Sequence, residues 1–341
     1  MKLNFLFILL IVVIVACNKH EKSTSTITNP ITIAFGSCAH SYDSLPIFNA
    51  ISKNKPDVWV WLGDIMYGDS HDMEVLKHKY SLQKAKPEYQ ALMSSTKIIG
   101  IWDDHDYGVN DGGKFYSEKE QSKTLLLDFL EVPTDDLVRN HPGVYSQHNY
   151  TFGDKLVKII LLDTRYFRDT LAPDFNSTRR YIPNEEGDIL GKEQWQWLEQ
   201  VLRNSKADFH IVGSGIQVVA DEQGYEKWAN FPKSRQRLFN LLASIKPKPL
   251  MLISGDRHMA EISKINIPGL SYPLYDFTSS GLTHTWGMAR DEPNRYRVDS
   301  LIISKNFGLI KLNWQKAKPE VTLEIRDERD KLLQRTKIDY Q

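Results

Sequence analysis

The sequence lacks a net charge, because 43 lysines and arginines balance 43 aspartates and glutamates among its 341 residues. Proteins that bind nucleic acids usually carry a basic excess, so we expect no nucleic-acid partner. Long blocks of like charge, low-complexity tracts and repeats of fixed period are also missing. The 41% of apolar residues and 25% of charged residues are ordinary for a globular protein. The length suits one large domain or two smaller ones.

Cysteine is scarce as well, with only two in the chain, Cys17 and Cys38. Cys17 follows an apolar run, Leu3–Ala16, which is shorter than the ~20 residues of a transmembrane helix and is typical of a secretory signal. The stretch Ile14–Cys17 resembles a bacterial lipobox, in which the cysteine is lipidated. We expect a lipoprotein signal peptide over 1–16, a polar tether over 17–30 and a single domain over 31–341.

The lipobox predicts that the protein is exported to the cell envelope and held at a membrane by the lipid on Cys17. Cys38 then has no disulfide partner, although thiols oxidise readily outside the cytoplasm. Two interpretations stay open for Cys38: a small buried apolar side chain, or a metal ligand.

Short apolar runs rich in β-branched residues alternate with helical patterns, which predicts an α/β domain. Beyond Ser254 the pattern becomes rich in strands, and we expect these to form a second, mostly antiparallel sheet layer. Strands are predicted at Ile31–Phe35, Asp57–Leu62, Ile98–Trp102, Leu156–Leu162, Phe209–Val212, Leu250–Ile253, Ile262–Ile265, Leu274–Thr278, Phe307–Trp314 and Val321–Arg326. Helices are predicted at Met73–Ser94, Ser117–Leu130 (with a capping box from Ser117 and Glu120), Lys192–Asn204 and Ser234–Ile245.

Polar clusters follow six of the predicted strands at their carboxyl ends. In open α/β sheets ligands bind beyond these ends, so the clusters are expected to meet. The six clusters are Gly36-Ser37-Cys38, Gly63-Asp64, Asp103-Asp104-His105, Asp163-Thr164-Arg165, Gly213–Gln217 and Gly255–His258.

The aspartates of the third cluster pose an electrostatic problem. Asp103, Asp104 and Asp106 repel one another unless a metal, an arginine or water separates them. Asp256 and His258, two positions apart, would point to one side of an extended segment and suit a divalent or trivalent metal. Each motif alone is also explained by a helix cap, a turn or simple packing.

Taken together, these side chains form a donor set rich in anions. Its six members are too many for a single zinc ion with four ligands, and they suit two or more cations that share bridging carboxylates. The set is Cys38, Asp64, Tyr67, Asp104, Asp256 and His258.

The order of these motifs resembles the PhoD-like alkaline phosphatase family of the calcineurin-like metallophosphoesterases. The resemblance extends over roughly Ile31 to Asp327 and implies an α/β fold in which a two-sheet sandwich is flanked by helices. Larger members carry an additional N-terminal β-domain, for which the residues before Ile31 leave no room. The motifs are Gly36-Ser37-Cys38, Gly63-Asp64-x-x-Tyr67, Trp102–Asp106, Asp163-Thr164-Arg165, Gly255-Asp256-x-His258 and Ser279–Thr283.

The resemblance also implies roles for the metal ligands. Tyr67 and Cys38 would bind ferric iron, Asp64 would bridge the metals, and Asp104 would bind a second ion, calcium. Asp256 and His258 would complete the metal shell. Other divalent metals remain open, because Ser37-Cys38-Ala39-His40 stands where related enzymes have Asp-x-His.

The implied activity is hydrolysis of phosphate monoesters or diesters by a metal-bound hydroxide. His105 and Arg165 would be catalytic, with Arg165 and Arg168 holding phosphate oxygens; Asn110 and Gln217 are possible supporting residues. Two alternatives remain: a phosphodiesterase, similar to a phospholipase D, acting on lipid head groups or wall polymers, and a non-catalytic surface lipoprotein that binds phosphate or a partner. The aromatic segments around Tyr225 and Trp286 would line a substrate cleft or simply pack.

Overall fold

The computed structural model of the chain describes residues 30–314 and 318–340. The predicted signal peptide, the predicted lipidation site Cys17 and all but the last residue of the predicted tether lie outside these ranges. Within them, every helix is too short or too polar to cross a membrane.

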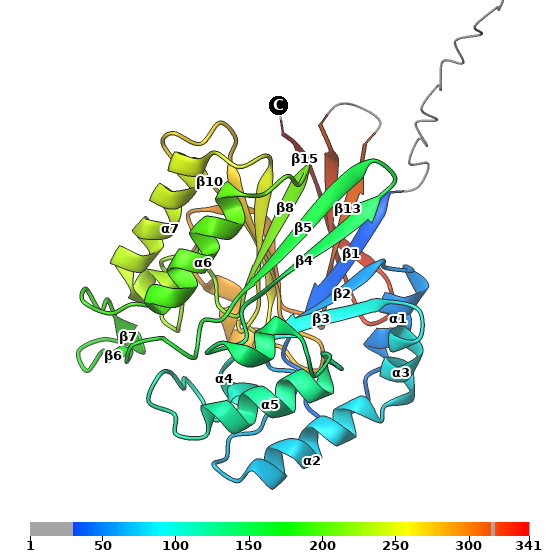
Figure 1. Ribbon diagram of the computed structural model, residues 1–341, viewed down its shortest axis with the longest axis vertical. Coiled ribbons are helices and arrows are strands. Elements are labelled where there is room, and N and C mark those ends of the chain that lie inside the picture. Colours follow the sequence, from blue (N-terminus) through cyan, green and yellow to red (C-terminus); the bar gives the residue numbers. More distant parts are fainter. Residues whose placement is uncertain (1–29, 315–317, 341) are drawn as a thin grey trace, which may run out of the picture.

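Two large β-sheets pack face to face to form a sandwich (Figure 1). Phe35 and Phe277 meet between the sheets with ring centroids 4.8 Å apart, and both belong to one continuous buried core. Burial of such a side chain stabilises the fold by about 1.5–3 kcal/mol. The predicted α/β class with a two-sheet sandwich is therefore confirmed.

The first sheet has six strands in the order β15-β14-β13-β1-β2-β3. Its β1, β2 and β3 are parallel and the remaining pairs are antiparallel. The strands are β1 (Ile31–Gly36), β2 (Val58–Leu62), β3 (Lys97–Ile101), β13 (Phe307–Asn313), β14 (Glu320–Arg326) and β15 (Leu332–Asp339).

The second sheet has seven strands in the order β12-β10-β11-β9-β8-β5-β4. Its four central strands, β11, β9, β8 and β5, are parallel, and antiparallel strands flank them. The strands are β4 (Ser146–Phe152), β5 (Lys155–Leu162), β8 (Phe209–Ser214), β9 (Leu250–Ser254), β10 (Ala260–Ile265), β11 (Leu274–Ser279) and β12 (Arg297–Ile302). A separate pair, β6 (Ala172–Pro173) and β7 (Tyr181–Ile182), forms a small ribbon.

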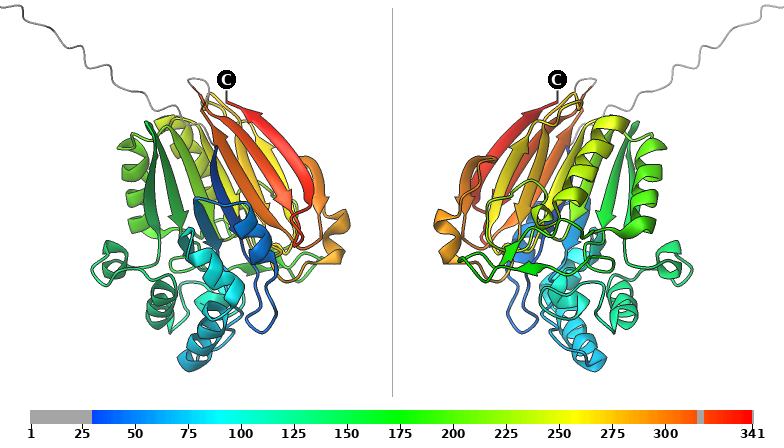
Figure 2. Two further views of the ribbon diagram at one scale, coloured as in Figure 1. Left: turned by 90° about the vertical axis from the view of Figure 1, so that its right-hand side faces the viewer. Right: turned by 90° about the vertical axis from the view of Figure 1, so that its left-hand side faces the viewer.

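Helices cover the outer face of the second sheet and the lower end of the molecule (Figures 1 and 2). α6 (Gly191–Arg203) and α7 (Pro232–Ile245) lie on the seven-stranded sheet. The others gather near the carboxyl ends of β1, β2 and β3: α1 (Ile47–Lys53), α2 (Met73–Lys84), α3 (Pro87–Met93), α4 (Asp104–Tyr107) and α5 (Lys119–Phe129), with short 3₁₀ turns at Leu137–Asn140, Trp228–Asn230 and Gly287–Asp291.

The structure corrects three details of the predicted elements. The late strands do not form a layer of their own: β10, β11 and β12 extend one sheet, and β13, β14 and β15 extend the other. The predicted helix Met73–Ser94 is two helices, because Pro87 lacks the N–H that would continue α2 and instead starts α3. The capping box at Ser117 is not formed, since the Ser117 hydroxyl donates to Glu118 Oε2 at 2.6 Å.

Candidate metal centre

The three parallel strands β1, β2 and β3 end at one edge of their sheet. The segments that follow them carry Cys38, Asp64 and Asp104, and the segment after β9 brings Asp256 and His258 from the other sheet. Gly63 allows this convergence, because a Cβ there would lie 2.3 Å from Asp103 Cβ. Its φ of +85° also lies in the left-handed region that glycine tolerates.

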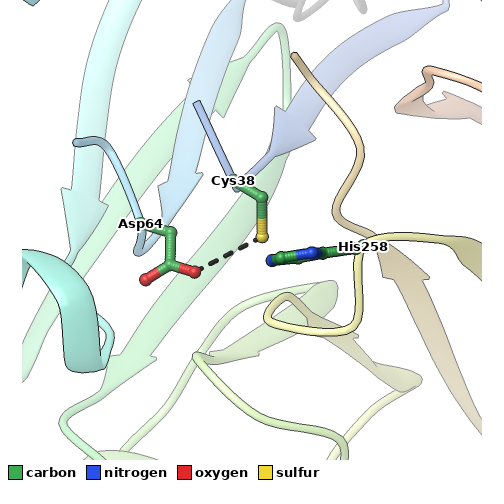
Figure 3. Close-up of side chains that lie close together, drawn as sticks. All are labelled: Cys38, Asp64 and His258. Carbon is green, nitrogen blue, oxygen red and sulfur yellow. Dashed lines mark hydrogen bonds between the residues drawn. The ribbon is translucent and has the colours of Figure 1, made fainter. Parts of the chain in front are cut away.

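Cys38, Asp64 and His258 point toward one another in the interior (Figure 3). The Cys38 thiol donates to Asp64 Oδ2 at 3.4 Å, and the ligand atoms of all three residues lie within 4.8 Å of one another. Thiolate, carboxylate and imidazole together suit a borderline transition metal.

The phenol of Tyr67 joins this group from the segment after β2. Its Oη lies 3.0 Å from His258 Nε2 and 3.1 Å from Nε2 of a second histidine, His284. His284 was not among the predicted ligands. The only sequence signal for it is its position directly after the Ser279–Thr283 motif.

Two further groups of donor atoms overlap the first. Asp64, Asp104 and His105 form one, and Asp103, Asp104 and Asp256 form the other. Because Asp64 and Asp104 each belong to two groups, they are placed as bridging carboxylates would be.

The segment Asp256–His258 corrects a prediction. Its two donors do not share one side of an extended strand, because φ is +68° at Asp256 and +52° at His258. The turn instead sends Asp256 to the aspartate group and His258 to the group of Cys38.

Four of the predicted metal ligands have a left-handed backbone conformation. Cys38 has φ of +64° and Asp64 has φ of +48°, as unusual for non-glycine residues as the values at Asp256 and His258. Such conformations cost on the order of 1–3 kcal/mol each and concentrate at functional sites. The fold therefore maintains strain where the donors converge.

Electrostatics explain why this cluster needs positive charge. Burial, followed by the Asp64 carboxylate, raises the pKa of the Cys38 thiol well above its usual value. Burial, followed by Cys38, likewise raises the pKa of Tyr67. Burial also raises the pKa of Asp64, and raises the pKa of Asp256 to about 7. The charged forms of these groups are unfavourable unless a cation compensates them.

Unsatisfied polar atoms provide a second indication that a cation fits. Asp64 Oδ1, Asp103 Oδ2, Asp104 Oδ1 and His258 Nδ1 are buried and have no hydrogen-bond partner among the described residues. Buried polar atoms are normally paired, because leaving one unpaired costs about 1–3 kcal/mol. Cations held by the carboxylates would satisfy the oxygen atoms.

His105 lies at the edge of the carboxylate group and keeps one nitrogen bound to the protein. Its Nδ1 lies 2.7 Å from Asp69 Oδ1, which orients the ring. Burial lowers the pKa of His105, but Asp64 and the hydrogen bond with Asp69 outweigh burial and raise it to about 10. Asp69 was not predicted, and nothing in its sequence context distinguishes it.

Arg165 and Arg168 differ from their predicted roles. Arg165 is fully buried, with Nε 2.6 Å from Asp103 Oδ1 and Nη1 2.5 Å from Glu226 Oε2. Its Nη2 has no hydrogen-bond partner within the described residues and lies 3.8 Å from Asp104 Oδ1. Burial raises the pKa of Asp104, but Arg165, His105 and the backbone N–H of Asp111 together outweigh burial and lower the pKa to about 2. Arg165 thus compensates the charge of the neighbouring carboxylates. The predicted contact of Arg165 with phosphate stays a prediction, and only its Nη2 has a free N–H for it.

The guanidinium of Arg168 contacts protein acceptors. It donates to the main-chain oxygens of Asp169 and Gly112, and its Nε lies 2.9 Å from Glu226 Oε1. These contacts give Arg168 a positioning role in place of the predicted substrate contact. The two possible supporting residues also lie elsewhere: Asn110 is exposed and donates to Asp111 Oδ2, and Gln217 donates to Glu261 and Thr278 within the second sheet.

Asp106 supports the cluster through hydrogen bonds that its carboxylate accepts from the main chain. Its Oδ1 accepts the backbone N–H of Asp103 at 2.7 Å and of Asp64 at 3.1 Å, and its Oδ2 accepts that of Ile65 at 3.3 Å. One carboxylate therefore fixes the segments after β2 and β3 relative to each other.

These features define the class: an α/β sandwich that gathers carboxylates, a thiol, a phenol and imidazoles into a metal-binding cluster at the strand ends. The model of the family described as PhoD-like phosphatase matches residues 33–288. The chain belongs to this family of metal-dependent phosphatases, and the resemblance seen in the sequence is confirmed.

Two individual proteins are similar to the chain. Alkaline phosphatase D of Bacillus subtilis (strain 168) is 21% identical over 280 residues, which cover 70% of this chain and 47% of that protein. The chain thus spans about half the length of this curated relative. A solved structure described as "Structure of PhoD" matches with a TM-score of 0.69 and 15% identity, covering 93% of this chain and 73% of that one. This second likeness concerns the fold.

Proposed function

We propose that the protein hydrolyses phosphate esters with the help of bound metal ions, as an enzyme of the alkaline phosphatase D type. The observation that carries the proposal is the overlap of three donor groups through Asp64 and Asp104. A cluster that shares two carboxylates can hold two or more cations a few ångströms apart, as two-metal phosphoesterases do.

The first group and the aspartate group differ in chemistry, which supports different metals. Cys38, Tyr67 and His258 favour a transition metal, and ferric iron is our proposal for this position. Asp103, Asp104 and Asp256 offer oxygen ligands, which suit calcium. When bound, such cations supply Lewis acidity and make water more acidic.

The chain's own residues would orient the ester and move the proton. His105 is held at Nδ1 by Asp69 and belongs to the donor group of Asp64 and Asp104, so its Nε2 can donate a proton to the leaving group. Arg165 compensates the charge of Asp103 and favours the ionised form of Asp104, and its Nη2 is free to donate to a phosphoryl oxygen. No side-chain nucleophile is needed for this reaction.

We further propose that the enzyme acts in the cell envelope, anchored by lipid on Cys17. The apolar run Leu3–Ala16 and the small residue before Cys17 support this location. Metabolic labelling with a fatty-acid analogue tests it: wild-type chain should be labelled and Cys17→Ser should not.

The activity is tested with p-nitrophenyl phosphate and its bis ester, using protein loaded with ferric iron and calcium. We expect hydrolysis of at least one ester, and we expect Asp64→Asn and Asp256→Asn to lose metal and activity together. Asp135→Asn is the matched control, because Asp135 is exposed and belongs to none of the three donor groups. A metal-loaded wild-type chain that cleaves neither ester would favour the non-catalytic binder.

A further inference from the structure

His284 lies beside the expected ligands without being one of them. It is half-buried, its Nε2 lies 3.1 Å from Tyr67 Oη, and its ring centroid lies 4.3 Å from that of His258. Tyr67 Oη therefore has an imidazole nitrogen on two sides, from His258 and from His284.

Hydrogen bonding around Thr283 fixes the tautomer of His284. The Thr283 hydroxyl donates to the Cys38 main-chain oxygen at 3.2 Å and accepts the backbone N–H of His40 at 3.0 Å. Its only proton is then used, so its 2.9 Å contact with His284 Nδ1 requires Nδ1–H as the donor. Nε2 is left with a lone pair, directed at Tyr67 Oη.

This arrangement is the one that metal-binding histidines adopt. Such histidines donate the N–H of one ring nitrogen to an oxygen and use the other nitrogen as the ligand. The ring of His284 is also held in place by the ring of His40, which stacks on it at 4.3 Å and 24°.

The spacing of the donor atoms fits a shared ion. Two ligands that each lie ~2.1 Å from one cation at a right angle are themselves about 3.0 Å apart. Tyr67 Oη is separated from the two imidazole nitrogens by 3.0 Å and 3.1 Å. These separations also suit hydrogen bonds, which hold the donors together until a cation replaces the proton of the phenol.

We propose that His284 is a further metal ligand, which supplies a second imidazole beside His258 and Tyr67. The inference rests on the metal centre of the proposed function and makes it more specific. Two imidazoles with a phenol and a thiol favour a transition metal over calcium at this position, because calcium prefers oxygen ligands.

The test uses the full chain stripped of metal and titrated with cobalt(II) chloride. X-ray absorption at one equivalent of cobalt counts the imidazole ligands, and visible absorption gives the dissociation constant. We expect two imidazoles in the wild type and one in His284→Phe, with binding weakened at least ~10-fold. Phenylalanine keeps the stacking on His40 and removes the Nε2 lone pair together with the Nδ1–H that donates to Thr283. His78→Phe, on the exposed face of α2, is the matched control and should bind like the wild type.

Three results overturn the inference: a single imidazole in the wild type, unchanged count and affinity in His284→Phe, or no uptake of cobalt by the wild type. The count on the wild type decides the question even if His284→Phe does not fold. Hydrolysis is not a readout here. A wild-type chain that binds cobalt through two imidazoles but cleaves no phosphate ester would overturn the proposed function alone.

Discussion

Arg165 Nε donates to Asp103 Oδ1 across 2.6 Å, and both side chains are fully buried. A buried guanidinium paired in this way compensates carboxylate charge in the interior, and its removal leaves that charge without a partner. Without Arg165, Asp103 would lose its counter-charge, and Glu226 would keep only Arg168, whose Nε lies 2.9 Å from Glu226 Oε1.

This relationship predicts that Arg165→Met destabilises the protein. We expect the free energy of unfolding to fall by about 3–5 kcal/mol, measured by urea denaturation of metal-free protein. Arg203→Met is the control, because Arg203 is half-exposed and pairs with Glu199 on the surface of α6, where about 0.5 kcal/mol is at stake. An Arg165→Met protein as stable as the wild type but without activity would return Arg165 to the role of a phosphate ligand.

Gly63 supports a second prediction. A Cβ at this position would lie 2.3 Å from Asp103 Cβ and Asp103 N, and φ is +85°. Gly63→Ala should therefore separate the segments after β2 and β3 and cost about 2–5 kcal/mol of stability. Gly287→Ala provides the comparison, since no atom lies within 4 Å of its added Cβ, and its thermal midpoint should match the wild type. Equal midpoints for both variants would contradict the argument.

Three of the strands that the sequence analysis missed share a physical cause. β4, β12 and β15 each lie at a sheet edge, where one side faces water and polar residues interrupt the apolar run. The central strands β5 and β8 are buried on both faces and could be predicted from their apolar residues alone.

The candidate site shows a similar limit. Donor types after strand ends predicted Cys38, Asp64 and His258 as neighbours, and the structure brings them together. Partners outside the motifs, such as Asp69 on His105, depend on tertiary contacts and could not be found. The burial of Arg165 could not be foreseen for the same reason, because its partner Glu226 lies 61 positions away in the sequence.

Asp106 leads to a third prediction. Both of its oxygens accept backbone N–H groups, from Asp64, Asp103 and Ile65. Asp106→Asn would turn one acceptor into a donor that faces an N–H, at a cost of about 1–3 kcal/mol. We also expect a lower metal content after dialysis, because Asp64 and Asp103 lose their common support. Metal analysis beside Asp135→Asn checks this, and an undiminished content would argue against the supporting role.

His210 gives a pH dependence away from the metal centre. Its Nε2 lies 2.7 Å from Ser205 Oγ and its Nδ1 3.2 Å from the Lys248 main-chain oxygen. Burial lowers the pKa of His210 to about 4, so between pH 4 and about 6.5 the unfolded chain binds a proton that the folded chain does not. Stability contributed by the neutral imidazole is therefore present above pH 6.5 and is lost as the pH falls toward 4, by about 3 kcal/mol.

The measurement compares urea denaturation of the wild type and His210→Asn from pH 4 to 7. The difference in stability between the two proteins should shrink as the pH falls, because asparagine does not titrate. A difference that stays constant over this range would show that His210 keeps an ordinary pKa.

The proposed ferric ion makes the last prediction optical. A phenolate or thiolate bound to ferric iron absorbs visible light by charge transfer, so protein loaded with ferric iron should be coloured. Tyr67 Oη lies 3.0 Å from His258 Nε2 and is the expected phenolate. Tyr67→Phe should shift or bleach the band, whereas Tyr42→Phe should not, because Tyr42 is 73% exposed on the surface.

The Cys38→Ser variant distinguishes the two candidate donors. If the band persists unchanged in Tyr67→Phe but disappears in Cys38→Ser, the thiolate is the chromophore and Tyr67 is not an iron ligand. A colourless wild type that is fully active with zinc or calcium alone would remove iron from the proposal and leave the carboxylate cluster as the metal site.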